Sequence, residues 1–282
     1  MTSDQLLPRA MRSISSASPH LRVLQWNVLS DQLAVNFPRV AESVLDWSYR
    51  EKLILAELAR ADADVLCLEE VDHFPELEAA LRPLGYSGIY EQKEDWHRDG
   101  TAIFYRSNRL VLEEKEGGTF SVRRQKYLLV KLRHRALNYS FVVVATHLKS
   151  YPHHEGTRLL QVHQILEHLR RYEALPMVLA GDMNTRPLKH VYKLMQSVGF
   201  QSAYWNALRP GAEPEFTCLA YRESDLLRLT LDYVWVKGWQ SCAVMTLPSE
   251  ADIGSTGLPC SKYPSDHLAL VCDLALSPQF RL

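Results

Sequence analysis

The segment PMVLAGDMN (176–184) begins as an apolar run and ends with two polar residues, Asp182 and Asn184. Short runs rich in Val and Leu are typical of buried strands. The preceding run, SFVVVATHL (140–148), has a similar composition and carries His147 near its end. Because packed strands bring their ends to a common edge of a sheet, we expect these polar side chains to meet there.

Other apolar runs along the chain share this pattern, with a carboxylate, an amide or an imidazole close to one end. Each such residue taken alone is weak evidence, since strand ends often carry structural polar groups. Several carboxylates at one edge would repel each other strongly without a cation, so the whole set indicates function. The runs are LRVLQW (21–26) before Asn27, DVLCLEEV (64–71) with Glu69 and Glu70, TLDYVW (230–235) with Asp232, and LALVCDL (268–274) after Asp266 and His267.

Strands alternate with helical patterns and also occur as hairpin-like pairs. This mixture predicts an α/β fold in which two mixed sheets pack face to face with helices outside. One pair, 101–114 and 118–133, predicts a hairpin that turns at Gly117 and Gly118. The helical segments, in which apolar residues recur on one face, are 48–60, 155–171 and 188–198.

The bulk composition excludes several classes of protein. The 282-residue chain has a formal net charge of −1, which argues against a strongly basic surface for non-specific nucleic-acid binding. Its five cysteines include no CxxC pair, which disfavours a disulfide framework or a structural zinc site and favours a reducing compartment. No segment approaches the roughly 18 apolar residues that a membrane span needs.

No repeat, low-complexity tract or linker divides residues 21–282, so the sequence predicts a single domain over this range. Residues 1–20 are rich in Ser and contain Arg9 and Arg12 but only one acid, Asp4. This composition predicts a disordered tail, and it also weakly resembles a mitochondrial targeting segment. We therefore expect a cytoplasmic protein, with the mitochondrion as the alternative.

The polar residues at the strand ends also indicate the chemistry. Oxygen ligands without thiolates suit Mg²⁺, and Glu70 is the strongest ligand candidate. A cation and His donors on the oxygens of a phosphoester lower the barrier to attack, while a second carboxylate orients or deprotonates water. The chain has no GxSxG motif, P-loop or GxGxxG, so direct attack by water is favoured over a covalent intermediate.

Short motifs follow one another along the chain in a specific order: QWNVLSD (25–31), CLEEVD (67–72), DGTAIFY (99–105), THLK (146–149), GDMN (181–184), TLDYVW (230–235) and YPSDHLALVCD (263–273). This series resembles the endonuclease/exonuclease/phosphatase superfamily, in its branch of nocturnin and the carbon-catabolite-repressor-type deadenylases. The resemblance extends from about residue 21 to residue 275. It implies a four-layered α/β sandwich in which helices flank two packed mixed β-sheets.

The resemblance also implies a role for each residue at the strand ends. Glu70 would hold Mg²⁺, or Mn²⁺ in its place, with Asn27 beside it in reach of the substrate and Asp266 near the water shell. One ion is expected rather than two, because Leu29 stands where other branches carry a second acidic ligand. Asp182 would activate the attacking water, and Asn184 and His147 would bind the phosphoryl oxygens. His267, oriented by Asp232, would stabilise the charge that develops on the phosphorus.

The chain departs from the family pattern at several positions. Glu69 stands where the family usually has Gln, and we expect its side chain to face solvent. Tyr151 replaces an Arg two residues after Lys149, and the segment before the DG motif is shortened to EDWHR (94–98). Trp96 or Tyr151 would suit stacking on a nucleobase, although an exposed loop with some packing explains such aromatics equally well.

For the substrate, the resemblance implies an adenine nucleotide. Lys149, Arg228 and Lys93 match phosphate-binding residues and favour a nocturnin-like enzyme that removes the 2′-phosphate of NADP(H). The alternative is a 3′–5′ exoribonuclease acting on the 3′ end of poly(A) RNA, which shares the catalytic residues but needs a track for several nucleotides. An inactive binding scaffold is disfavoured because every catalytic position is filled. We expect the protein to be a monomer.

Overall fold

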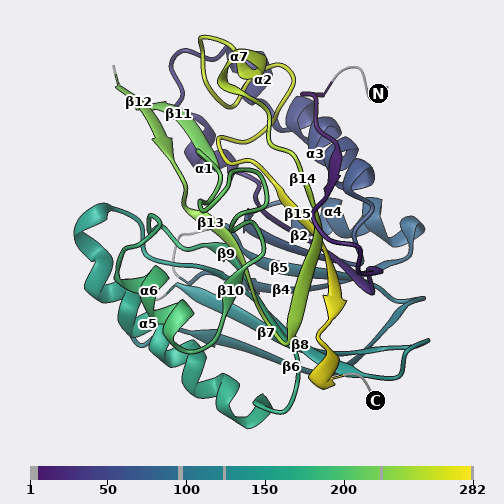
Figure 1. Ribbon diagram of the computed structural model, residues 1–282. Coiled ribbons are helices and arrows are strands. Elements are labelled where there is room, and N and C mark those ends of the chain that lie inside the picture. Colours follow the sequence, from purple (N-terminus) through teal and green to yellow (C-terminus); the bar gives the residue numbers. More distant parts are fainter. Residues whose placement is uncertain (1–5, 95–97, 123–124, 223–224, 281–282) are drawn as a thin grey trace.

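The computed structural model describes residues 6–94, 98–122, 125–222 and 225–280. Two β-sheets face each other, and helices cover the outer face of each sheet (Figure 1). Both sheets contain parallel and antiparallel neighbours. The predicted fold class, a four-layered α/β sandwich of two mixed sheets flanked by helices, is therefore confirmed.

The first sheet contains, in spatial order, β1 (Met11–Ser13), β14 (Trp239–Met245), β15 (Leu270–Leu276), β2 (Leu21–Asn27), β3 (Val65–Val71), β5 (Gly100–Arg106) and β4 (Tyr86–Gln92). Strands β2 and β3 run parallel, and the other neighbours pair antiparallel. Strand β15 lies in the interior of this sheet between β14 and β2. The parallel pair places the ends of β2 and β3 at the same edge of the sheet.

The second sheet contains β10 (Gln201–Ser202), β13 (Asp232–Lys237), β9 (Met177–Asp182), β8 (Ser140–His147), β7 (Lys126–His134) and β6 (Leu110–Thr119). Its parallel pair is β8 with β9. A separate two-stranded hairpin, formed by β11 (Cys218–Arg222) and β12 (Asp225–Leu229), extends from one end of the sandwich (Figure 1). Each sheet thus contributes one parallel pair whose strand ends carry the polar residues noted in the sequence.

The prediction of a hairpin turn at Gly117 and Gly118 is wrong. Both glycines lie inside β6 and pair with β7, and the backbone N–H of Phe120 donates to the carbonyl of Gln125 at the turn. A Cβ at Gly118 would collide with the ring of Tyr127, so glycine here makes room for an aromatic side chain. The run predicted as the first strand is divided between β5 and β6, which lie in different sheets.

The longer helices are α3 (Trp47–Ala61), α4 (Phe74–Leu81), α5 (Glu155–Leu169) and α6 (His190–Ser197). They include the three helical segments predicted from the sequence. Helices α3 and α4 pack on the first sheet, and α5 and α6 on the second (Figure 1). Among the described residues, none of the helices combines the length and the apolar character that crossing a membrane would require. The shorter elements are α1 (Asp31–Ala34), α2 (Glu42–Leu45), α7 (Glu250–Ile253), η2 (Arg82–Leu84), η3 (Pro152–His154), η4 (Arg170–Tyr172) and η5 (Pro278–Phe280).

Apolar side chains fill all three spaces between the four layers. The layer between the sheets includes Val23, Cys67, Val143 and Val178, none of which is exposed. Because both faces of each sheet are covered, the strands are nearly continuous apolar runs rather than alternating ones. The other two layers pack α3 and α4 on one sheet, through residues such as Ile54, Leu58 and Leu77, and α5 and α6 on the other, through residues such as Val162, Ile165 and Tyr192.

The predicted disordered tail over residues 1–20 is wrong for residues 6–20, and residues 1–5 lie outside the described residues. Leu7 is fully buried in the core, and β1 pairs with β14 at the edge of the first sheet. The Arg9 guanidinium is buried and forms an ion pair with the buried carboxylate of Glu57. The composition of this segment suggested disorder. Composition does not reveal the buried ion pair of Arg9 with Glu57, which ties the polar segment to the core.

Candidate active site

Three neighbouring strands of the second sheet bring their polar ends together at Asp182. In the parallel pair of β8 and β9, His147 lies opposite Asp182. Strand β13 runs antiparallel to β9, so its first residue, Asp232, lies on the other side of Asp182. The register therefore places one imidazole and two carboxylates in a row at the edge of the sheet, as the sequence predicts.

Gly181 makes this close approach of β8 and β9 possible. A Cβ at this position would collide with the carbonyl oxygen of Thr146 on β8. Its φ of 155° also lies in the range that favours glycine. The glycine of the GDMN motif thus sets the position of the carboxylate that follows it.

Asp182 is 2% exposed and lies at the centre of the cluster. Its Oδ2 atom is 3.5 Å from His147 Nε2 and 3.7 Å from His267 Nε2. The side-chain amide of Asn27 donates to the same oxygen at 3.3 Å. Burial raises the pKa of Asp182 above its ordinary value; the charge of His267 opposes this effect and that of Asp232 adds to it. A carboxylate with a raised pKa is suited to accept a proton near neutral pH.

The strand pairing is irregular at the end of β3, and this changes the direction of the Glu70 side chain. The pairing of β3 with β5 shifts between Leu68 and Val71, and Glu70 has a φ of 57°, which residues with a Cβ rarely adopt. The side-chain amide of Asn27 donates to Glu70 Oε1 at 3.0 Å, and the backbone N–H of Ser30 donates to Oε2 at 3.1 Å. The irregularity thus joins the ends of β2 and β3 in one hydrogen-bonded group.

Lys93 and several hydrogen-bond donors surround the Glu70 carboxylate. Burial raises its pKa, but the neighbouring His147 ring, the charge of Lys93 and the hydrogen bonds from Asn27 and Ser30 outweigh this effect and lower the pKa of Glu70 below its ordinary value. Glu70 is therefore ionised at neutral pH although only 6% of it is exposed. An ionised, buried carboxylate is the form that binds a hard cation.

His267 has a carboxylate partner on one side of its ring. Its Nδ1 atom lies 2.9 Å from Asp232 Oδ2, and the hydroxyl of Thr217 donates to the same oxygen at 2.6 Å. Burial lowers the pKa of His267, but Asp232 and further groups around the ring raise it well above its ordinary value. The ring is therefore an imidazolium at neutral pH, with its Nε2 proton directed at the region of Asp182.

His147 has the opposite charge state. Burial, followed by the charge of Lys93, lowers the pKa of His147 to about 3. Its contacts with Asp182 and with Glu70 Oε1, which lies 3.9 Å from Nδ1, are therefore those of a neutral imidazole. The surroundings of His147 and His267 thus give the two rings different charges at neutral pH.

Asn184 joins the site through the turn that follows β9. Its backbone N–H donates to Asp182 Oδ1 at 2.9 Å, and its side-chain amide donates to the carbonyl of Leu148 at 3.1 Å. The residue has a φ of 48°, a conformation that Asn tolerates better than most residues. Asn184 therefore links the end of β9 to the loop that follows β8.

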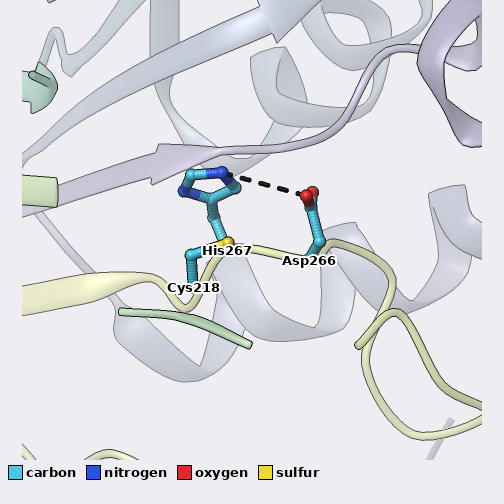
Figure 2. Close-up of side chains that lie close together, drawn as sticks. All are labelled: Cys218, Asp266 and His267. Atoms are coloured by element: carbon cyan, nitrogen blue, oxygen red, sulfur yellow. Dashed lines mark ion pairs between the residues drawn. The ribbon is translucent and has the colours of Figure 1, made fainter. Parts of the chain in front are cut away.

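Cys218 also belongs to this site, and no motif in the sequence indicated it. It is the first residue of β11, and its backbone bridges that of His267. Figure 2 shows its side chain close to His267 and Asp266, whose Oδ2 is 3.9 Å from His267 Nε2. The sulfur lies within 4.8 Å of a ring nitrogen of His267. Only the three-dimensional pairing of distant segments places this thiol at the site.

The expectation that Glu69 faces solvent is wrong, because its side chain is fully buried. Gln25 donates to Glu69 Oε2 at 2.9 Å and to Asp232 Oδ1 at 3.1 Å, and thereby connects the two sheets beneath the site. Burial raises the pKa of Glu69 well above its ordinary value. Burial therefore favours the uncharged form of the Glu69 carboxyl.

Two of the three predicted substrate-binding cations lie next to the catalytic cluster. The charges of Lys93 and Lys149 both lower the pKa of His147, and Lys93 also acts on Glu70. Arg228 lies on the β11–β12 hairpin, where its guanidinium pairs with the carboxylates of Glu215 at 2.7 Å and Glu250 at 3.7 Å. These two acids would compete with a phosphate for Arg228.

The donor set around Glu70 fits a hard divalent cation. The amide of Asn27 donates to both Glu70 and Asp182, and Asp266 lies beside His267; each of these three carboxylates is at most 6% exposed. Such a concentration of buried acids is favourable when a cation offsets it. Glu70, Asn27 and Asp266 would supply the oxygen ligands that Mg²⁺ prefers.

The two mixed sheets end side by side at this cluster. Carboxylates, amides and an imidazolium with a carboxylate partner meet there, and this combination defines a hydrolase of phosphoester bonds. The chain belongs to the Endonuclease/Exonuclease/phosphatase family, whose family model matches residues 24–267. Within this family it is similar to nocturnin of Rattus norvegicus. The two are 32% identical over 292 residues, which cover 94% of this chain and 68% of the relative.

Two further relatives agree with this assignment. The structure of the human nocturnin catalytic domain with bound sulfate anion superimposes with a TM-score of 0.79 at 30% identity, covering 95% of this chain and 97% of that one. Carbon catabolite repressor protein 4 homolog 3 of Arabidopsis thaliana is 24% identical over 345 residues, covering 94% of this chain and 77% of the relative. The predicted resemblance to this branch of the family is therefore confirmed.

Proposed function

We propose that the protein is a Mg²⁺-dependent hydrolase that removes the 2′-phosphate of NADP(H), with Mn²⁺ as an alternative ion. The observation that carries this proposal is the ionised Glu70 carboxylate surrounded by cations and donors, beside a protonated His267. This arrangement offers positive charge and hydrogen bonds to a phosphate from several sides. Similarity to nocturnin supports the choice of substrate.

Three residues would hold the ion. Glu70 would provide a carboxylate, and Asp266 would order the water shell. Asn27 Oδ1 accepts from the N–H of Leu29 at 3.1 Å, so Asn27 would offer this oxygen to the ion after its side-chain amide turns over. Bound Mg²⁺ would neutralise charge on the phosphoryl oxygens. We infer a single ion rather than two, because Leu29 stands where other branches carry a second acidic ligand.

The remaining residues would act on water and phosphate. Asp182 would orient the attacking water and accept its proton, as its raised pKa favours. His267 would donate its Nε2 proton in a hydrogen bond to a phosphoryl oxygen, with Asp232 holding the ring. Neutral His147 and the amide of Asn184 would contact the other phosphoryl oxygens.

The loop after β8 would bind the rest of the substrate. Tyr151 is exposed and has a φ of 72°, a conformation that is costly for an aromatic residue. Lys149 Nζ lies 6.0 Å from the centre of the Tyr151 ring, so a cation and a flat aromatic surface lie side by side. We infer that Tyr151 stacks on the nucleobase and that Lys149 contacts a phosphate; Trp96 lies outside the described residues.

The decisive experiment measures inorganic phosphate released from NADPH and NADP⁺ by the purified protein. We expect release with Mg²⁺ that stops when a chelator is added and falls below about one hundredth in Glu70→Ala. The matched control is Glu173→Ala, which removes an exposed carboxylate and should leave the rate unchanged. Failure of the wild-type protein to release phosphate would contradict the proposal.

A parallel assay with labelled poly(A) tests the competing function, a 3′–5′ exoribonuclease. Similarity to carbon catabolite repressor protein 4 homolog 3 is the observation that favours this alternative. Shortening of poly(A) that is abolished in Asp182→Ala, without phosphate release from NADPH, would establish it instead. Absence of both activities would leave a binding scaffold.

We also propose a reducing compartment, the cytoplasm or alternatively the mitochondrion. The five cysteines all carry free, buried thiols, which supports this assignment. We propose a monomer as the active form, which gel filtration with light scattering would test. A dimer at working concentration would overturn that proposal.

A further inference from the structure

Cys218, Asp266 and His267 form a compact group of three different metal-binding side chains. A sulfur, a carboxylate oxygen and a ring nitrogen all lie within 4.8 Å of one another, and each residue is at most 7% exposed. Figure 2 shows the three side chains converging from two separate segments of the chain. The proposed function uses Asp266 and His267 but gives no task to the thiol.

Backbone pairing, rather than a flexible loop, holds this group together. Cys218 and His267 form an antiparallel bridge, and the N–H of Leu219 donates to the carbonyl of Asp266 at 3.2 Å. The backbones of the three residues are therefore fixed relative to one another. A ligand that needs all three side chains would find them already close together.

We propose that Cys218, Asp266 and His267 bind a thiophilic divalent cation, Zn²⁺, which inhibits the enzyme when it occupies this group. Sulfur, nitrogen and oxygen donors from three residues, with water as the fourth ligand, match the composition of tetrahedral zinc sites. Zinc bond lengths of about 2.0–2.3 Å place tetrahedral donors about 3.4–3.6 Å apart. The 3.9 Å between His267 Nε2 and Asp266 Oδ2 therefore needs a shift of only about half an ångström.

The thiol distinguishes this site from the one proposed at Glu70. The Glu70 group offers oxygen donors, which suit Mg²⁺, whereas a thiolate selects softer ions such as Zn²⁺. On binding, the Cys218 thiol and the His267 imidazolium each release a proton to solvent, and the metal takes their place. Mg²⁺ has little affinity for the thiolate, so it should compete with Zn²⁺ only through Asp266, which both groups share.

Inhibition follows from what the bound ion would remove. Zn²⁺ on His267 Nε2 would withdraw the proton that this ring is proposed to donate, and Zn²⁺ on Asp266 would remove a group from the Mg²⁺ water shell. The inhibitory effect thus rests on the proposed function. The binding of the ion does not, because it needs only the three side chains.

Binding is tested with Co²⁺ in the presence of Mg²⁺, because a cobalt–thiolate bond absorbs in the near ultraviolet whereas zinc has no such spectrum. We expect one equivalent of Co²⁺ to produce this absorption in the wild type and in Cys242→Ser, which alters a buried thiol elsewhere. Cys218→Ser and Cys218→Ala should lose it, and circular dichroism shows whether each is folded. Absorption that persists in folded Cys218 variants, or is absent from the wild type, overturns the proposal.

Glu70→Ala separates this proposal from the proposed function. This variant should be inactive yet keep the cobalt–thiolate absorption, because Glu70 is not a ligand of the second site. Loss of the absorption in Glu70→Ala would overturn the two-site assignment. If the wild type shows no phosphoester hydrolysis at all, the spectroscopic result still decides whether the site exists.

Inhibition is tested by titrating Zn²⁺ into the hydrolysis assay at excess Mg²⁺, with each protein compared to its own uninhibited rate. Removal of one ligand should raise the Zn²⁺ concentration for half-inhibition at least about tenfold in Cys218→Ser. Cys242→Ser should respond as the wild type does. Equal inhibition of both variants would mean that zinc acts at Glu70 instead.

Discussion

The Asp232 carboxylate illustrates how single residues are fixed in this site. Its Oδ2 accepts hydrogen bonds from Thr217 and faces His267 Nδ1, while its Oδ1 accepts from Gln25. Both oxygens are therefore engaged, and the carboxylate is only 1% exposed. Such a group orients the imidazole and supports its positive charge.

Asp232→Asn should therefore lower kcat by about 10²–10⁴-fold while changing KM much less, because the amide no longer stabilises the imidazolium. Steady-state kinetics with the best substrate measure both constants. Asp62→Asn is a suitable control, since Asp62 is exposed at the end of α3, in a left-handed conformation that Asn also tolerates. A kcat within about threefold of the wild type would contradict the role of Asp232.

At the residue scale, the sequence located most of the cluster because polar residues that end apolar runs are conspicuous. Asn27, Asp182 and His147 were predicted in this way, and the structure brings them together. The same reasoning failed for Glu69, which precedes Glu70 at the end of one run and was expected to face solvent. When a strand is buried on both faces, alternation does not reveal which side chain joins the polar cluster, and the irregularity in β3 changes the alternation.

At the scale of elements, Arg158 of α5 holds the loop that follows β8. Its buried guanidinium donates to the carbonyl oxygens of Lys149 and Tyr151, each at 2.7 Å, and to that of Pro152 at 3.3 Å. The carboxylate of Glu155 pairs with it at 2.8 Å. A helix thus fixes the conformation of a loop that would otherwise adopt many.

Arg158→Met should raise KM for the nucleotide more than it lowers kcat, because the loop loses its anchor while the strand ends keep theirs. Buried carbonyls left without donors should also cost about 3 kcal/mol of stability. Kinetics and chemical denaturation measure the two effects. Arg170→Met, which removes an exposed guanidinium, is the control and should be close to neutral. An unchanged KM in Arg158→Met would refute the anchoring role.

Glu213 couples α6 to the segment before β11 and makes stability depend on pH. Burial raises the pKa of Glu213 from 4.5 to about 7, and the hydroxyl of Tyr192 donates to it at 2.8 Å. The folded protein therefore keeps a proton that the unfolded chain releases at lower pH. Stability should fall as the pH rises from about 4.5 to 7, by about 3 kcal/mol in total.

Glu213→Gln removes this titration and should make the protein more stable than the wild type at pH 8 but not at pH 4.5. Chemical denaturation at a series of pH values gives the difference between the two proteins. Glu215→Gln changes a neighbouring, exposed carboxylate and should show no such trend. A stability difference that does not vary with pH would rule out Glu213 as the cause.

The elements themselves were predicted with uneven success. Helices α3, α5 and α6 were found because their apolar residues recur on one face. The turn between β6 and β7 was misplaced, because Gly117 and Gly118 serve packing rather than turning. A glycine in the sequence indicates that a larger side chain does not fit at that position. Only the neighbouring strand in the structure shows whether packing or a turn is the reason.

At the scale of the whole molecule, the segment before β2 closes one edge of the first sheet and reaches the core. Arg9 donates to the carbonyl of Thr246 at 3.0 Å and pairs with Glu57, which also pairs with Arg60. Its guanidinium also donates to the carbonyl of Ala269, two residues after His267. The N-terminal segment therefore supports the loop that carries His267.

Arg9→Met should cost about 3 kcal/mol of stability, because it leaves Glu57 with one buried partner instead of two. The midpoint of urea unfolding measures the loss, with an unchanged slope if the folded state stays intact. Arg12→Met, at an exposed position of β1, is the matched control. Equal midpoints for the two variants would show that residue 9 does not contribute to the core.

The interior position of β15 has a consequence for protein synthesis. Strands β2 and β14 are synthesised before β15. The position of β15 between them in the sheet therefore stays empty until β15 has been synthesised. A message with a premature stop before Leu270 would yield a product with two open strand edges, which invite aggregation. The facing edges of β2 and β14 therefore stay unpaired until Leu270–Leu276 has been synthesised, and a product that stops before Leu270 should show no phosphoester hydrolysis.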